Sequence, residues 1–222
     1  MSGVSPRRQA LAMELLHATD GPCRIKLCGM FREQDIVAVN AAEPDFCGFI
    51  VDFPESHRSL SSTGAARLAH DVRPDVFTVG VSVDAPVARV GDNGNLFDVL
   101  QLHGHEDNGY IRHLRLRTRA PIIQAIQVLS EKDVERANRS AADMVLLDSG
   151  HGTGNGFDWS LINGMSRPFV LAGGLTPENV AQAVGELHPW GVDMSSGIET
   201  ARLKDPEKIR AAVAAVRSAS NA

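Results

Sequence analysis

Residues 168–180 read Pro-Phe-Val-Leu-Ala-Gly-Gly-Leu-Thr-Pro-Glu-Asn-Val, and this stretch holds one complete structural unit. A short apolar run ends in two glycines, which is typical of a buried strand entering a tight turn. Thr176, Pro177 and Glu178 then combine a capping hydroxyl, a proline for the first helical position and an acid for the first turn. The stretch predicts a strand, a turn and a helix whose N-cap is Thr176.

Similar apolar runs recur along the whole chain. Eight runs start at residues 24, 45, 76, 97, 121, 143, 168 and 191, so successive starts lie 21 to 31 residues apart. This spacing fits one strand, two loops and one helix. Because most runs are apolar almost throughout, we expect strands that are covered on both faces. Eight such units favour a closed (β/α)8 barrel over an open doubly wound sheet, whose Gly-x-Gly-x-x-Gly fingerprint does not occur in the first turn.

No change of composition divides the chain, which predicts one α/β domain: a (β/α)8 TIM barrel over residues 22–222 with an extension over residues 1–21. A helix in the extension would place four apolar side chains on one face, namely Leu11, Ala12, Leu15 and Leu16. We expect this extra helix to pack on the barrel. In the third unit, residues 85–95 are few and contain two glycines, so its helix should be shortened to a single turn or frayed.

Composition excludes several classes of protein. With 43% hydrophobic and 22% charged residues, the chain is an ordinary globular protein. A net charge of -5 without a Lys/Arg-rich run argues against nucleic-acid binding, and no apolar run approaches the ~18 residues that span a bilayer. The three cysteines, Cys23, Cys28 and Cys47, show no Cys-x-x-Cys spacing, which indicates free thiols in a reducing compartment. We therefore expect a cytoplasmic protein.

Two reactive side chains follow strand-like runs, where such barrels carry their active sites. Asp148 comes after Met-Val-Leu-Leu, so burial would raise its pKa and suit a general acid, although an N-cap or loop aspartate would look the same. Cys28 is either a base, if a helix N-terminus near Phe31 favours its thiolate, or an inert core residue.

Other candidate residues would bind a ligand. Arg58 suits a carboxylate or phosphate, or is simply solvated, and His103 either donates to a ligand or is a structural histidine. Gly173, Gly174, Ser196 and Gly197 follow the seventh and eighth runs, where such barrels often bind phosphate; the alternative is that these glycines only make tight turns.

Two further patterns carry less weight. The glycine-rich segment 150–156 lacks the Lys-Ser/Thr of a P-loop, and we interpret it as a flexible loop over the strand ends. No pair of histidines spaced i, i+4 has a supporting carboxylate, so we expect no metal.

Six motifs in order resemble the phosphoribosylanthranilate isomerase family from about Arg24 to the C-terminal helix. They are Lys-x-Cys-Gly, Gly-Phe-Ile-Val with a later Ser-x-Arg, Gln-Leu-His-Gly, Leu-Leu-Asp-Ser with Gly-Thr-Gly-x-x-Phe-Asp-Trp, Leu-Ala-Gly-Gly-Leu-Thr-Pro-Glu-Asn-Val, and Asp-x-Ser-Ser-Gly-Ile-Glu followed by Lys-Asp-Pro-Glu-Lys-Ile. Any one of these motifs is weak. Six at barrel spacing are specific.

The resemblance implies an Amadori rearrangement of N-(5-phosphoribosyl)anthranilate in tryptophan biosynthesis, without cofactor or metal. Cys28 then matches the general base and Asp148 the general acid. Arg58 matches the arginine that meets the anthranilate carboxylate, and His103 a residue of the substrate pocket. The glycine-rich turns, Gly173, Gly174, Ser196 and Gly197, match the phosphate site. We expect a monomer or homodimer that binds a phosphorylated small molecule.

The chain departs from the family pattern at several positions. Phe31 stands where a Thr or Ser is common, His57 replaces a proline, His151 replaces a glycine, and the usual glycine between Glu199 and Lys204 is missing. Two alternatives stay open: another phosphosugar isomerase or epimerase barrel, and an inactive barrel that only binds a phosphometabolite or a partner.

Overall fold

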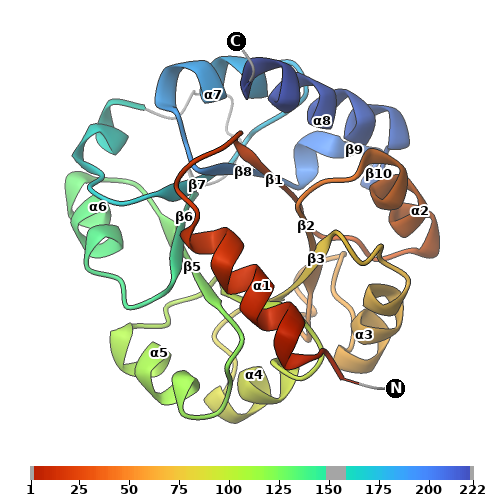
Figure 1. Ribbon diagram of the computed structural model, residues 1–222, viewed down its shortest axis with the longest axis vertical. Coiled ribbons are helices and arrows are strands. Elements are labelled where there is room, and N and C mark those ends of the chain that lie inside the picture. Colours follow the sequence, from red (N-terminus) through yellow and green to blue (C-terminus); the bar gives the residue numbers. More distant parts are fainter. Residues whose placement is uncertain (1–2, 149–158, 221–222) are drawn as a thin grey trace.

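A closed barrel of eight parallel strands forms the centre of the computed structural model, which describes residues 3–148 and 159–220 (Figure 1). The strands are β1 (Arg24–Leu27), β2 (Phe46–Ile50), β3 (Phe77–Ser82), β4 (Val99–Leu102), β5 (Ile122–Gln127), β6 (Met144–Asp148), β7 (Phe169–Ala172) and β8 (Gly191–Met194). Each strand lies within one of the eight apolar runs. The first strand closes the barrel against the last, with Lys26 paired to Asp193 in the register. The predicted (β/α)8 fold is confirmed.

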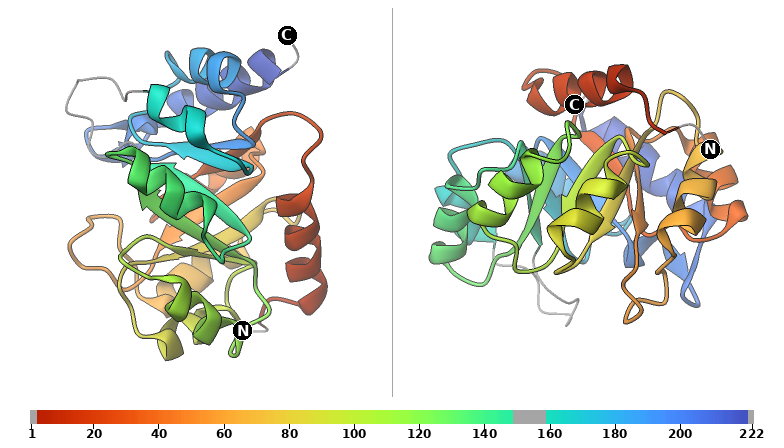
Figure 2. Two further views of the ribbon diagram at one scale, coloured as in Figure 1. Left: turned by 90° about the vertical axis from the view of Figure 1, so that its left-hand side faces the viewer. Right: turned by 90° about the horizontal axis from the view of Figure 1, so that it is seen from below.

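Helices surround the barrel and follow the strands in alternation (Figures 1 and 2). They are α2 (Glu33–Ala42), α3 (Ser62–His70), α4 (Val87–Asn93), α5 (Asn108–Arg115), α6 (Glu131–Asn138), the 3₁₀ helix η1 (Trp159–Gly164), α7 (Val180–Leu187) and α8 (Pro206–Ser220). Between β8 and α8 the chain adds the short 3₁₀ helix η2 (Ser196–Ile198) and a hairpin of β9 (Glu199–Thr200) and β10 (Leu203–Lys204). Among the described residues, no helix is long and apolar enough to cross a membrane.

Side chains alternate between two apolar layers along each strand. On β6, Met144 and Leu146 belong to the cluster inside the barrel, whereas Val145 and Leu147 belong to the cluster between sheet and helices. Both faces of the strands are therefore buried, which explains why the runs are nearly continuous in the sequence.

The helix boundaries follow the sequence signals with two differences. The helix α4 is short as predicted, but it spans seven residues rather than a single turn. Thr176 does cap the turn after β7, because its Oγ1 accepts from the amide of Glu178 at 3.3 Å. However, residues 177–179 form a turn, and regular helix begins only at Val180. At the start of α8, Asp205 Oδ1 accepts a hydrogen bond from Glu207 N at 2.9 Å.

The predicted extra helix is α1 (Pro6–His17), which lies across the end of the barrel where the strands begin (Figures 1 and 2). Ala12 and Leu16 pack into the barrel's interior cluster. The predicted face is confirmed for Ala12 and Leu16, and the partly buried Leu15 packs against the same cluster. Only Leu11 differs: it is 44% exposed, and Gln9 is buried instead. The register follows from the positions 9, 12 and 16, which share one helical face.

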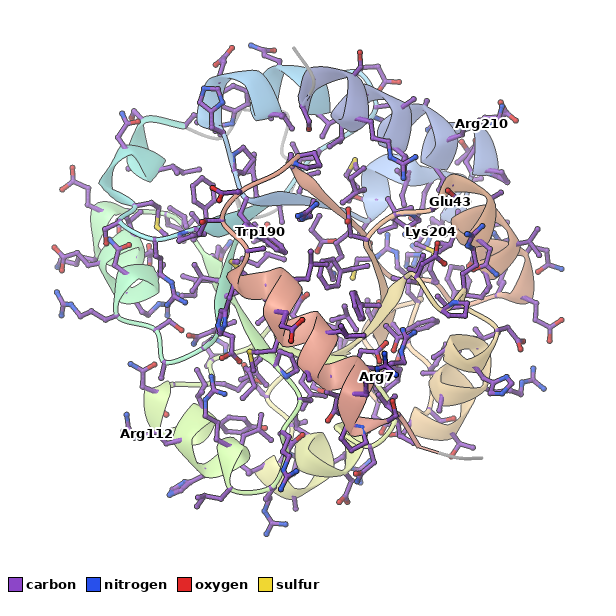
Figure 3. The ribbon with its side chains drawn as sticks, in the orientation of Figure 1. Arg7, Glu43, Arg112, Trp190, Lys204 and Arg210 are labelled. Carbon is purple, nitrogen blue, oxygen red and sulfur yellow. The ribbon has the colours of Figure 1, made fainter. Side chains whose placement is uncertain are left out.

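Polar contacts anchor α1 to the barrel. Arg8 donates to both carboxylate oxygens of Asp98, at 2.8 and 2.7 Å. At the other end, Trp190 Nε1, in the residue labelled in Figure 3, donates to the carbonyl of Ala18 at 2.8 Å. The N-terminal mouth of the barrel is thus covered by the chain itself. The glycine-rich segment 150–156, predicted as a loop over the strand ends, lies outside the described residues.

Candidate active site

A cavity of about 420 Å³ opens at the C-terminal ends of the strands. Its lining includes most of the residues that the sequence analysis selected: Cys28, Arg58, His103, Asp148, Gly173, Gly174 and Ser196. Gly197 is not among the lining residues. A larger cavity of about 610 Å³ lies at the opposite end, near Cys23 and Trp190, and contains none of the selected residues. The chemistry predicted from the sequence therefore converges on one site.

Cys28 follows β1 directly and is 7% exposed. Its amide donates to Met194 O at 2.9 Å, and its carbonyl accepts from Ser195 Oγ at 3.1 Å, so β8 holds the backbone on one side. Burial raises the pKa of the Cys28 thiol, whereas the positive charges of Lys26 and Lys204 lower it and Asp193 raises it. Burial is the largest of these effects.

The helix N-terminus near Phe31 does not supply the positive potential suggested by the sequence. Helix α2 begins at Glu33, and the amides of Phe31 and Arg32 both donate to Asp35 Oδ2 at 3.0 Å. These donors are already used by a carboxylate of their own helix. The cations near the thiol are instead two lysines that sequence reasoning did not select.

Lys26 lies inside the barrel and is 3% exposed. Its Nζ donates to Asp193 Oδ2 at 2.9 Å. The other oxygen of this carboxylate, Oδ1, is buried and has no hydrogen-bond partner among the described residues. Asp193 also lines the cavity.

Asp148 ends β6 and faces the same cavity. Its Oδ2 lies 3.4 Å from Nε2 of His103, and Nδ1 of His103 is 3.1 Å from Nε2 of Gln101. If the Gln101 amide donates to Nδ1, the histidine carries its proton on Nε2 and presents it to Asp148. The structure therefore pairs His103 with the candidate acid, a contact that the sequence did not reveal.

Arg58 reaches the cavity from the segment after β2. It forms a bidentate pair with Glu199, with Nε and Nη2 at 2.6 and 2.7 Å from the two carboxylate oxygens. Gly29 makes room for this side chain, because a β-carbon there would lie 2.6 Å from Arg58 Cδ. The bidentate pair uses one edge of the guanidinium and leaves the other edge available to a substrate carboxylate.

Lys204, labelled in Figure 3, joins this group from β10. Its Nζ lies 2.8 Å from Glu199 Oε1 and donates to Ser195 O at 2.9 Å. The hairpin places Glu199 directly opposite Lys204 in the register. Its two turn residues, Ala201 and Arg202, both have positive φ, at 50° and 64°. Glycine favours this left-handed conformation, but the family's usual glycine between Glu199 and Lys204 is missing here. Two residues with side chains therefore form the turn.

Two departures from the family pattern contact each other. The rings of Phe31 and His57 meet edge to face, with centroids 5.9 Å apart. His57 Nε2 also lies 3.9 Å from Glu199 Oε2. Both unusual residues therefore border the group that holds Arg58.

The turns after β7 and β8 touch each other. Gly173 and Gly174 have φ of 90° and 66°, and Gly174 O accepts from Asn179 Nδ2 at 3.0 Å. A β-carbon at Gly197 would lie only 1.9 Å from Leu175 O, so glycine is required for this close approach. Gly197 shapes the turns from behind, while Gly173, Gly174 and Ser196 face the cavity.

The arrangement is that of a (β/α)8 enzyme that moves protons: a carboxylic acid and a thiol face one cavity at the end of the barrel where such enzymes carry their catalysts. The family model for N-(5'-phosphoribosyl)anthranilate (PRA) isomerase matches residues 25–215. The chain belongs to this family, as its motifs suggested.

Individual relatives agree with this assignment. The isomerase of Endomicrobium trichonymphae is 37% identical over 202 residues, covering 88% of this chain and 98% of the relative. The crystal structure of the isomerase from Thermotoga maritima is similar, with a TM-score of 0.78, 33% identity and coverage of 88% of this chain and 99% of that one. Another solved isomerase, in complex with reduced 1-(o-carboxyphenylamino)-1-deoxyribulose 5-phosphate, has a TM-score of 0.76, 33% identity and coverage of 88% and 99%.

Proposed function

We propose that this chain converts N-(5′-phosphoribosyl)anthranilate to 1-(2-carboxyphenylamino)-1-deoxyribulose 5-phosphate in tryptophan biosynthesis, with Asp148 as general acid and Cys28 as general base. The observation that carries the assignment is that these two side chains, from β6 and β1, line one cavity. Membership of the isomerase family supports the reaction.

The reaction needs two proton transfers, and the site has a group for each. Asp148 protonates the ribose ring oxygen, so the C1–O bond breaks and the ring opens to an iminium. Cys28 as thiolate removes the proton from C2, and the electron pair neutralises the iminium to give an enolamine. Tautomerisation then moves a proton to C1 and leaves the ketone at C2. His103, whose Nε2 lies 3.4 Å from Asp148 Oδ2, orients the acid.

The remaining residues bind the two ends of the substrate. The free edge of Arg58 receives the anthranilate carboxylate, with Glu199 holding the guanidinium from behind. Gly173, Gly174 and Ser196 receive the phosphate at the turns after β7 and β8, and Gly197 keeps those turns together. The cytoplasmic location and the monomeric or homodimeric state stay predictions; one solved relative is described as a monomer generated from a dimeric isomerase.

The test is turnover of two active-site variants and one control variant. Cys28→Ala should lower kcat/KM by on the order of 10³-fold or more, because the base is lost. Asp148→Asn should do the same. Cys23→Ala, which removes a thiol at the opposite end of β1, should behave as wild type. Complementation of a tryptophan auxotroph that lacks the isomerase gives the same comparison in cells.

Two results would contradict the assignment. Turnover close to wild type in Cys28→Ala would remove the thiol from the mechanism. A wild-type protein that binds the product analogue but shows no turnover would instead favour the inactive binding barrel.

A further inference from the structure

The Cys28 thiol stands beside a buried cation that the mechanism above does not use. Lys26 is two residues earlier on β1, and its side chain points into the barrel on the same face as Cys28. The two side chains share the space left by Gly48 on β2: a β-carbon there would lie 2.8 Å from Cys28 Sγ and 3.2 Å from Lys26 Nζ. A glycine at this position lets the ammonium and the thiol approach each other.

Asp193 keeps Lys26 charged in this interior. Burial disfavours the ammonium, but the charge of Asp193 at 2.9 Å and the nearby thiol outweigh it, so the pKa of Lys26 is raised. The direction of this shift and the 2.9 Å contact with Asp193 both favour the charged form of Lys26. Lys204, whose side chain is 0% exposed, adds a second positive charge near Cys28.

Several ion pairs surround the Cys28 thiol. Lys26 pairs with Asp193, and Arg58 and Lys204 both pair with Glu199. Beyond Lys204 lies Arg32, which donates to the Lys204 carbonyl and pairs with Asp35. The other titratable groups nearby are the buried thiol of Cys47 on β2 and, across the cavity, His103 and the candidate acid Asp148. A thiolate at Cys28 would be a second anion beside the Lys26 ammonium. Buried charges are tolerated when they are paired in this way.

We propose that Lys26 is a positioning residue that acts as the counter-ion of the Cys28 thiolate, held in place by Asp193. The catalytic consequence rests on the proposed role of Cys28 as base. The contact itself does not depend on the substrate, so it is tested on the free protein.

The experiment follows alkylation of Cys28 by iodoacetamide as a function of pH, read out by peptide mass spectrometry. Lys26→Met should raise the midpoint pH for Cys28 by about one to three units, because an opposite charge within reach is lost. Lys26→Arg, which keeps the charge, should stay near wild type. Asp193→Asn should lower the midpoint, because the Cys28 thiolate then replaces the lost carboxylate as the anion that pairs with the Lys26 ammonium. Cys23, at the far end of β1, serves as the internal reference and should not change.

Opposite shifts in Lys26→Met and Asp193→Asn would support the proposal, because general damage to the fold moves both variants in one direction and moves Cys23 as well. An unchanged midpoint in Lys26→Met would overturn it. If Lys26→Met does not fold, Lys26→Arg and Asp193→Asn decide, and an unchanged midpoint in Asp193→Asn overturns the proposal. This test is separate from the test of the proposed function. If Cys28 is not the base, Cys28→Ala will turn over substrate like wild type, whatever the pH midpoint of Cys28 alkylation is.

Discussion

A pair of charged residues inside the barrel, Lys26 and Asp193, sets the electrostatic surroundings of this site. Lys26 and Asp193 lie 167 positions apart and meet only because β1 and β8 close the barrel. In the sequence, a lysine within a strand-like run is normally taken to face solvent. Because both faces of these strands are buried, the alternation of side chains does not show which face points inward. The position of Cys28 and Asp148 at the cavity was predictable, because both stand at the ends of apolar runs. The ion pair of Lys26 and Asp193 next to the thiol was not predictable.

The stability of the fold should depend on pH through the carboxylate of Glu199. Burial alone would raise its pKa, but the hydrogen bonds and charges of Arg58 and Lys204 lower it from 4.5 to about 2. Between these values the unfolded chain binds more protons than the folded one, so stability rises with pH. The contribution is complete above about pH 4.5 and is lost as the pH falls through about 2.

We therefore expect Glu199→Gln to flatten the acid limb of the stability curve. Wild type should lose more free energy of unfolding between pH 4.5 and 2 than this variant does, as measured by urea unfolding at several pH values. Glu207→Gln, an exposed change on α8, should keep the wild-type slope. Parallel curves for Glu199→Gln and wild type would show that the carboxylate is not held by its two cations.

At the scale of elements, the turns after β7 and β8 act as one unit. The sequence predicted both turns and the helices that follow, because glycines and capping residues are local signals. It did not show that Gly197 approaches Leu175 O so closely, since that contact joins two turns about twenty residues apart. Regular helix in α7 begins later than the capping signal because Asn179 is tied to Gly174 and Thr176 in the preceding turn.

Gly197→Ala should separate the two turns and weaken phosphate binding. A β-carbon there would meet the Leu175 carbonyl, so the backbone must move. We expect KM for the substrate to rise about tenfold or more, and the inhibition constant of inorganic phosphate to rise with it. Gly185→Ala on α7, where a β-carbon meets nothing within 4 Å, is the matched control and should leave both constants unchanged. Unchanged constants in Gly197→Ala would mean that the turns do not form the phosphate site.

At the scale of the whole molecule, the two ends of the barrel have separate roles. Candidate catalytic groups lie where the strands end, whereas α1 covers the other mouth and lies before the family match, which starts at residue 25. The sequence predicted this helix and most of its buried face from its apolar residues, but it included the exposed Leu11 and missed the buried Gln9. The missing information was long-range: Arg8 bonds Asp98, and this contact sets the rotation of α1.

Leu16→Ala should test this division. Leu16 is 2% exposed in the barrel's interior cluster, so its truncation should cost about 2–5 kcal/mol of unfolding free energy. The value of kcat should not change, because the cavity of the site is at the other end. Leu11→Ala, on the exposed side of the same helix, should cost less than about 0.5 kcal/mol. Equal costs for the two leucines, measured by urea unfolding, would contradict the observed rotation of α1.

The closure of β1 against β8 has a consequence for the order of assembly. Lys26 and Cys28 are made early in synthesis, whereas Asp193, Glu199 and Lys204 belong to the last fifth of the chain. A nascent or truncated chain therefore carries the thiol without the ion pairs that surround it in the finished barrel. The surroundings that we propose for the Cys28 thiolate are therefore complete only when the final strand has paired with the first.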